Sequence, residues 1–185
     1  GTLRTVGTGV IGFEASNNTL AGGITLDGQI EQDDGQTQQI TGGFVNEGTY
    51  SLNSTGALTV LNFNGAQTLS GPGVIEMTDN AGNRIINTND VLTHAAGHTI
   101  RGAGNLLANT GGMLHQGTIE ATGSTALTID PNGLGFVNEG TLSALGSGGI
   151  RLEAGNFTNT GHSIDVADGS NLTLVTAVTI AGGTL

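Results

Sequence analysis

Short runs in which apolar and polar residues alternate recur along the chain. Four pairs illustrate them: Leu58 and Val60, Leu127 and Ile129, Ile150 and Leu152, and Leu172 and Leu174. A period of two is typical of β-strands, whose successive side chains point to opposite faces. Turn-like segments such as Gly71-Pro72-Gly73 lie between the runs. The pattern therefore predicts many short strands separated by tight turns.

An Asn-x-Gly triplet accompanies these runs five times, beginning at Asn46, Asn80, Asn109, Asn138 and Asn159. One longer match is present as well, because residues 43–49 (GFVNEGT) recur as residues 135–141. Repeats of about 20 to 50 residues indicate units that bury their apolar face only by stacking on neighbours. We therefore predict an all-β fold, a parallel β-helix of about seven irregular coils. Because crossovers between parallel strands are right-handed in about 98% of cases, we expect a right-handed helix.

Within each coil, alternate side chains should point inward and stack on their equivalents in the coils above and below. This assigns Ile119 and Ala121 to the interior, and likewise Leu142 and Ala144. The recurring Asn is expected to be a turn or ladder residue. Asn tolerates the left-handed conformation, and amide side chains in register can hydrogen-bond along the stack.

A second motif, of the type Thr-Leu-x-Gly, offers a way to place the coil boundaries. It occurs within residues 19–23, 39–43, 68–73, 99–104 and 179–183. On this alignment the coils at 44–73, 74–104 and 105–135 exceed the about 20 residues of a minimal coil. We therefore expect them to carry loops that bulge from the rod, which is where repeat proteins usually carry function.

The glycine content raises disorder as an alternative, since glycine supplies 34 of 185 residues. Hydrophobic residues make up 36% and charged residues 10%, the reverse of a chain too polar to bury a core. The glycines therefore punctuate a packed structure. We find no segment that reads as a linker, and we expect residues 1–185 to form a single β-helix domain that is a fragment of a longer protein.

The charge balance excludes several partners. The net charge is −11, there is no lysine, and the four arginines are Arg4, Arg84, Arg101 and Arg151. Such a surface disfavours phosphate backbones and anionic membrane surfaces, so we expect no nucleic-acid partner. No apolar stretch approaches the about 18 residues of a membrane span, so we expect no membrane insertion. The chain has no cysteine, which excludes disulfides and thiolate metal sites.

One set of carboxylates falls into register when neighbouring coils are superposed. Aligning Gly117, Gly140 and Gly161, with one extra residue after the last, places Glu120, Ser143 and Asp165 in one outward column. Two coil steps would separate the carboxylates by about 10 Å. Inverting glycosidases use about 6.5 to 9.5 Å. Glu120 and Asp165 are thus the alternative catalytic pair, whereas a solvated polar face is the favoured explanation of the column, because outward positions of a β-helix are polar in any case.

We predict no cofactor and no committed metal site, and calcium stays open. His94 and His98 have the four-residue spacing of a helical zinc site, but no Glu follows the first His, so we expect a solvated turn. Asp33 with Asp34, and Asp165 with Asp168, could supply the clustered oxygen ligands that Ca²⁺ takes. Neither the helix-loop-helix nor the nonapeptide calcium pattern accompanies them.

Segments 136–142 (FVNEGTL) and 157–161 (FTNTG), with Gly-x-Gly turns between, resemble the degenerate repeats of large exported bacterial β-helix proteins. These are the autotransporter passengers and the filamentous-haemagglutinin-like adhesins. The resemblance covers nearly the whole chain and concerns architecture. It implies a secreted or cell-surface right-handed β-helix that works as an adhesive or spacer stalk.

Two hypotheses for function follow. The leading one is a non-enzymatic structural or adhesive module that binds a glycan or another host or cell-surface ligand, and that can associate end to end through its open coils. The alternative is a carbohydrate-active enzyme, either a polysaccharide lyase or a glycoside hydrolase, with a groove along the rod. A lyase would need Arg101 and Arg151 to converge on one face with Glu120 or Asp165.

Overall fold

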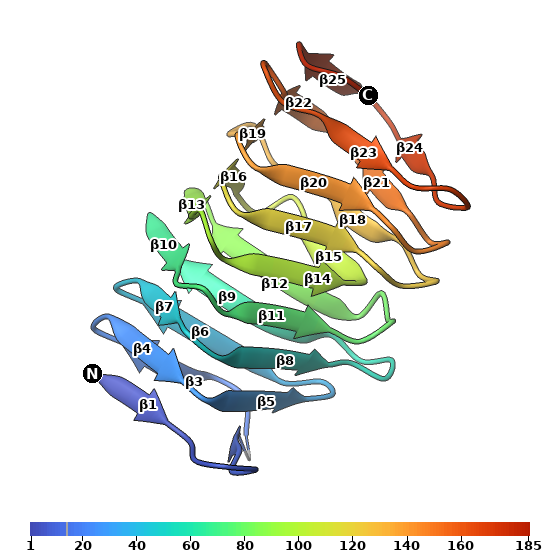
Figure 1. Ribbon diagram of the computed structural model, residues 1–185. Coiled ribbons are helices and arrows are strands. Elements are labelled where there is room, and N and C mark those ends of the chain that lie inside the picture. Colours follow the sequence, from blue (N-terminus) through green and yellow to red (C-terminus); the bar gives the residue numbers. More distant parts are fainter. Residues whose placement is uncertain (14) are drawn as a thin grey trace.

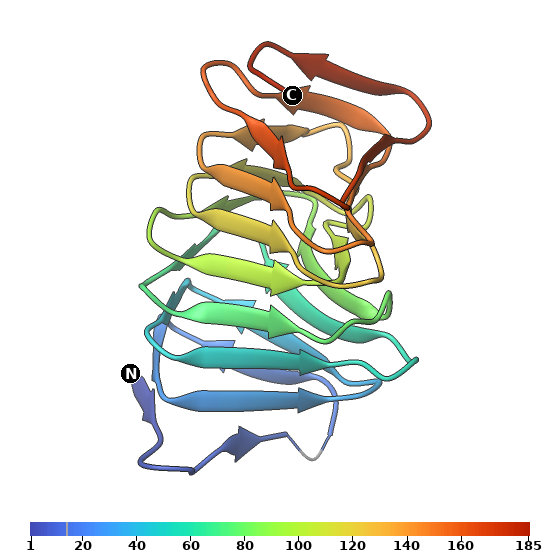
Figure 2. The ribbon, with the colours of Figure 1, turned by 45° about the vertical axis from the view of Figure 1, so that its right-hand side comes forward.

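The computed structural model, which describes residues 1–13 and 15–185, is a solenoid of short parallel strands (Figure 1). Its 25 strands form three sheets, and each turn of the chain adds one strand to each sheet. Eight complete turns stack in chain order from one end to the other (Figure 2), and β25 begins a ninth. The predicted parallel β-helix is therefore confirmed, with a number of turns close to the expected seven.

The three sheets are named A, B and C in the order in which a turn meets them. Sheet A contains β1 (Thr2–Arg4), β4 (Ile24–Asp27), β7 (Phe44–Asn46), β10 (Gln67–Ser70), β13 (Val91–His94), β16 (Gly112–His115), β19 (Phe136–Asn138), β22 (Gly155–Thr158) and β25 (Val178–Ala181). Sheet B contains β2 (Ile11–Gly12), β5 (Gln29–Asp33), β8 (Thr49–Asn53), β11 (Val74–Met77), β14 (Thr99–Gly102), β17 (Thr118–Ala121), β20 (Thr141–Ala144) and β23 (Ile164–Val166). Sheet C contains β3 (Asn18–Ala21), β6 (Thr37–Thr41), β9 (Thr59–Asn64), β12 (Asn83–Thr88), β15 (Gly104–Leu106), β18 (Leu127–Ile129), β21 (Ile150–Leu152) and β24 (Leu172–Leu174).

The turns are more uniform than the sequence motifs indicated. Residues paired across neighbouring turns lie from 19 positions apart, as Thr99 and Thr118 do, to 25 apart, as Phe44 and Leu69 do. The expectation of three long coils with bulging loops at 44–73, 74–104 and 105–135 is wrong, because each of these segments holds more than one turn.

The error comes from the Thr-Leu-x-Gly motif, which marks corners of different kinds. Its copy at 19–23 spans the end of β3 in sheet C, the copy at 68–73 the end of β10 in sheet A, and the copy at 99–104 the end of β14 in sheet B. All three corners need a residue that turns the chain tightly. At Gly102, for example, φ is +122° and a Cβ would collide with the Met77 carbonyl of the preceding turn.

Apolar side chains fill the interior as ladders that run along the solenoid. The sheet B ladder consists of Ile30, Tyr50, Ile75, Ile100, Ile119, Leu142 and Ile164, all fully or almost fully buried. Ala121 and Ala144 occupy the next inward position, as predicted. Because every rung packs on the rungs above and below, burial of this ladder holds neighbouring turns together.

The recurring Asn residues are turn devices, as expected. The amide oxygens of Asn46, Asn80 and Asn138 accept hydrogen bonds from the N–H of the glycine two residues later, at 2.8 to 3.2 Å. Asn138 also donates to the amide oxygen of Asn159 on the next turn, at 2.7 Å. Asn109 adopts the left-handed conformation, with φ of 57°. The Asn-x-Gly pattern therefore fixes corners and satisfies polar groups inside the solenoid.

Candidate functional site

The outer face of sheet B carries a continuous column of polar side chains. In register from one end, the column contains Glu31, Ser51, Glu76, Arg101, Glu120, Ser143 and Asp165. The predicted alignment of Glu120 with Ser143 and Asp165 is confirmed. The column also places Arg101 directly beside Glu120, an arrangement that the sequence analysis did not anticipate.

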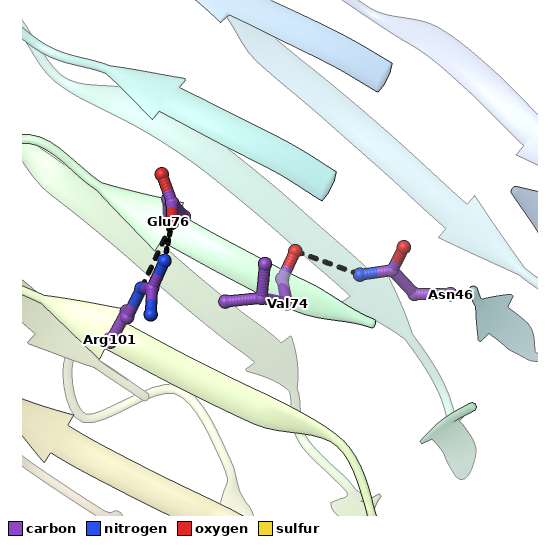
Figure 3. Close-up of polar contacts among 4 residues, drawn as sticks. All are labelled: Asn46, Val74, Glu76 and Arg101. Carbon is purple, nitrogen blue, oxygen red and sulfur yellow. Dashed lines mark hydrogen bonds and ion pairs between the residues drawn. The ribbon is translucent and has the colours of Figure 1, made fainter. Parts of the chain in front are cut away.

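Arg101 points toward the carboxylate on the other side of it in the column. Its Nε donates to Glu76 Oε1 at 2.9 Å, and its terminal nitrogen contacts the same oxygen (Figure 3). The Arg101 side chain is 48% exposed and the Glu76 side chain is 41% exposed. Solvent therefore screens the ion pair, and its effect on stability is small. In the same view, Asn46 donates to the Val74 carbonyl at 2.9 Å and ties sheet A to the start of β11.

The proposed catalytic pair lies on a sheet face open to solvent. Glu120 is half-buried and Asp165 is exposed, and two strand steps separate them, about 10 Å. Arg101 lies on β14 in sheet B, whereas Arg151 lies on β21 in sheet C. The two arginines therefore lie on different faces. A lyase would need them on the same face.

A hollow of about 510 Å³ adjoins one end of this column. It is lined by Gly140, Thr141, Gly161, His162, Ser163, Asp165, Gly183 and Thr184. Asp165 is thus at a concave surface, and Glu120 is not among the lining residues. His162 is the other titratable group there, so this hollow brings a carboxylate and an imidazole to one place.

Three histidines lie inside the solenoid and form one hydrogen-bonded chain. His94, His98 and His115 have no exposed surface, so the expectation of a solvated turn at His94 and His98 is wrong. His98 Nδ1 lies 3.0 Å from His94 Nε2, and His94 Nδ1 lies 3.0 Å from His115 Nδ1. Asn46 Nδ2 closes one end, 3.1 Å from His98 Nε2, and the Thr141 carbonyl closes the other, 2.9 Å from His115 Nε2.

This chain has one consistent direction when all three rings are neutral. The amide oxygen of Asn46 accepts from a backbone N–H, so its nitrogen donates to His98. His98 then donates to His94, His94 donates to His115, and His115 donates to the backbone carbonyl. Burial is the main cause that lowers the pKa of His98 and His115 to about 4 and that of His94 well below its usual range. The neighbouring rings lower the pKa of His94 further.

The sequence contained a signal for this cluster. His94 and His115 are 21 residues apart, close to one turn, and they pair directly between β13 and β16. His115 pairs in turn with Asn138, so it continues the Asn column. A fixed spacing of about one turn between uncommon residues is therefore informative in a solenoid.

The acidic residues considered for calcium are placed differently. Asp34 accepts hydrogen bonds from the N–H groups of Thr55, Gly56 and Ala57, and the first of these bonds is the main cause that lowers its pKa. Asp165 lies on β23 and Asp168 in the loop after it, both exposed. Within the described part of the chain, no three His, Asp or Glu side chains are grouped so as to hold a metal ion.

Residues 1–13 and 15–185 include no helix with the length and apolarity needed to cross a bilayer. Compared with known proteins, the chain matches no family model, and neither a curated protein nor a solved structure is significantly similar to it.

Proposed function

We propose that this chain is a non-enzymatic structural and adhesive module of a secreted or cell-surface bacterial protein, of the kind built by autotransporter passengers and filamentous-haemagglutinin-like adhesins. The observation that carries the proposal is the unbroken register. Each sheet continues from turn to turn without a skipped strand, and the turns stay within 19 to 25 residues. Such a rod presents long, regular polar faces, and extended faces of this type suit recognition of extended ligands.

The buried chain of hydrogen-bonded histidines supports a structural role for the module. His94, His98 and His115 are enclosed in the core and satisfied by one another, by the Asn46 side chain and by the Thr141 carbonyl. Their hydrogen bonds connect successive turns, which is a role in holding the rod together. We also propose that the helix is right-handed, as the strong preference of parallel crossovers favours.

A carbohydrate-active enzyme is the second candidate, and one observation favours it. Glu120 and Asp165 share an outward column with Ser143 between them, and Asp165 lines a hollow. The spacing of about 10 Å lies just beyond the range of inverting glycosidases. A glycan that settled along sheet B would meet both carboxylates.

A glycan-array binding screen, run beside an activity screen on the same polysaccharides, separates the two candidates. Both are done with and without calcium, since calcium binding is still open. We expect saturable binding without turnover. Hydrolysis or eliminative cleavage that is lost in Glu120→Gln or Asp165→Asn, but kept in Ser143→Ala, would replace the adhesive proposal with the enzymatic one. Turnover that survives both carboxylate changes would place an active site elsewhere.

A further inference from the structure

The outer face of sheet C carries a hollow of about 300 Å³ with an arginine at each end. Arg84 on β12, Asn105 on β15, Thr128 on β18 and Arg151 on β21 occupy one column, each paired with the next across neighbouring turns. All four line the hollow, and residues from the adjoining corners complete it: Ala81, Gly104, Thr125 and Ala126. Two of the four arginines of the chain therefore line one concave site.

The carboxylate partners of Arg84 and Arg151 are absent or more distant than those of the other two arginines, among the described residues. Arg4 and Arg101 form direct ion pairs with carboxylates on neighbouring strands. Among the described residues, Arg84 makes no such pair, and its Nε is buried without a hydrogen-bond partner. The nearest carboxylate to Arg151 is that of Glu153, at 3.8 Å and partly exposed. A buried N–H that lacks an acceptor is costly, so the Arg84 guanidinium gains from an oxyanion that binds its other nitrogens.

The lining defines the kind of ligand that fits. A guanidinium presents paired N–H groups that match a carboxylate or sulfate. Asn105, Thr125 and Thr128 add the amide and hydroxyl groups that hydrogen-bond sugar hydroxyls. The volume is at the lower end of the range of about 300 to 1,000 Å³ for small-molecule sites, which suits a single ring.

We propose that this hollow binds one acidic sugar residue of a glycan, with its carboxylate or sulfate held by Arg84 and Arg151 and its hydroxyls by Asn105 and Thr128. The inference rests on the proposed adhesive function and names the class of ligand for it. The site lies on sheet C, apart from the Glu120 and Asp165 column on sheet B.

Two nearby acids restrict the ligand further. Glu153 contacts Arg151, and Asp130 is close enough to Arg84 and Glu153 for their charges to shift its pKa in opposite directions. Burial is the main cause that raises the pKa of Asp130. With these acids beside the hollow and a net charge of −11 on the chain, densely sulfated polymers are repelled. The hollow therefore favours an isolated acidic sugar over a polyanion.

The direct test is an NMR titration of the 185-residue chain, labelled with ¹⁵N, against three matched sugars. Glucuronate and glucose 6-sulfate each carry one oxyanion on a glucose ring, and glucose is the neutral control. We expect saturable shifts at the Nε–H of Arg84 and Arg151 with at least one of the acidic sugars and none with glucose. A response to one acid only identifies the oxyanion that is preferred. Equal shifts with glucose, or acid-induced shifts confined to Arg101, would overturn the assignment.

Variants then test the roles of the arginines. Arg84→Gln and Arg151→Gln should each weaken acidic-sugar binding by about tenfold or more, and Arg84→Lys should be intermediate because it keeps the charge and loses the planar fork. Arg101→Gln is the matched control on sheet B and should bind as the unaltered chain does. Melting temperatures confirm that each variant is folded. Unchanged affinity in the Arg84 and Arg151 variants, when folded, refutes the site.

The same reagents separate this inference from the adhesive function. Glycan-array binding that is unaffected by the Arg84→Gln and Arg151→Gln changes would leave the adhesive function in place and reject this hollow. Binding of a free acidic sugar at the two arginines, without any array binding, would support the hollow and reject the adhesive function.

Discussion

Buried polar side chains are where single residues of this protein matter most. The neutral chain through His98, His94 and His115 uses one donor and one acceptor on each ring. A proton added to any ring would place two donors against each other in a buried environment. The tautomers of the three rings and the stability of the middle turns are therefore coupled.

The first prediction is that stability falls in mild acid. The pKa of His98 and His115 is about 4 in the folded protein, against an ordinary value of 6.5. The unfolded chain therefore binds more protons as the pH drops below about 6.5. The stability that the neutral, buried histidines allow is fully present above about pH 6.5, and it is lost progressively as the pH falls to about 4. Each titrating histidine should cost about 1.4 kcal/mol per pH unit.

Denaturant unfolding at several pH values between 7.5 and 5 measures this slope. His115→Asn is the useful variant, since Asn occupies the same column at Asn138 and does not titrate. It should reduce the slope by the contribution of one histidine. Stability that stays constant across this range would show that the buried histidines do not govern the response to acid.

The second prediction concerns two buried Asn residues on β12 that have opposite roles. The side chain of Asn83 donates to Thr78 and Ala103 and accepts from the Ser54 N–H. Among the described residues, the amide nitrogen and oxygen of Asn87 have no partner. Asn83→Leu should destabilise by about 1 to 3 kcal/mol because it leaves buried groups unpaired, and Asn87→Leu should be neutral or stabilising. Chemical denaturation of the two variants compares them directly, and a large loss for Asn87→Leu would contradict the assignment.

At the scale of the strands, sequence periodicity identified inner and outer faces wherever one face was clearly polar. It placed Ile119 and Leu142 correctly inside. It was misleading at the start of β9, where Leu58, just before the strand, is 50% exposed and Val60 is only half-buried. There the interior position between them is Thr59. Apolar residues on both faces of a strand remove the period on which the inference depends.

The third prediction tests the face assignment on one strand. Leu142 is 1% exposed on the inner face of β20, and Ser143 lies half-buried on the outer face. Leu142→Asp buries a charge without a partner, which costs more than the about 5 to 15 kcal/mol of a domain's net stability. It should unfold the middle turns, whereas Ser143→Ala should change the melting temperature little. Comparable losses in thermal melts of the two variants would mean that the strand is assigned one residue out of register.

For the whole molecule, the candidate sites differ in how far sequence alone could reach them. The column of Glu120 and Asp165 was accessible because Gly117, Gly140 and Gly161 mark equivalent corners in those three turns. The hollow between Arg84 and Arg151 could not be predicted from the sequence. The two residues are three turns apart, and the three turns differ in length, so their alignment requires knowledge of the strand pairing. An error of a few residues in turn length changes the predicted number of turns little. The same error moves a side chain to a different position on the face, so it prevents the prediction of which side chains group together.

The ends of the solenoid are the last feature with a testable consequence. Core side chains are only partly buried in the outer turns, among them Leu3, Ile11, Phe13 and Leu20 at one end and Leu172, Val178 and Ile180 at the other. The outer strands of sheet A, β1 and β25, each have a single neighbour. Open strand edges over exposed core residues favour pairing with another molecule, and the charge of −11 opposes it.

The fourth prediction is therefore end-to-end association that increases with salt. Raising the ionic strength shortens the screening length from about 10 Å at 0.1 M to about 3 Å at 1 M, which weakens the repulsion and leaves the apolar contact. Ile180→Lys puts a charge into the open end of the core and should abolish the association. Thr179→Lys adds the same charge on the exposed outer side of β25 and should retain it. Light scattering across a range of protein and salt concentrations measures the mass, and equal masses for the two lysine variants would rule out stacking through this end.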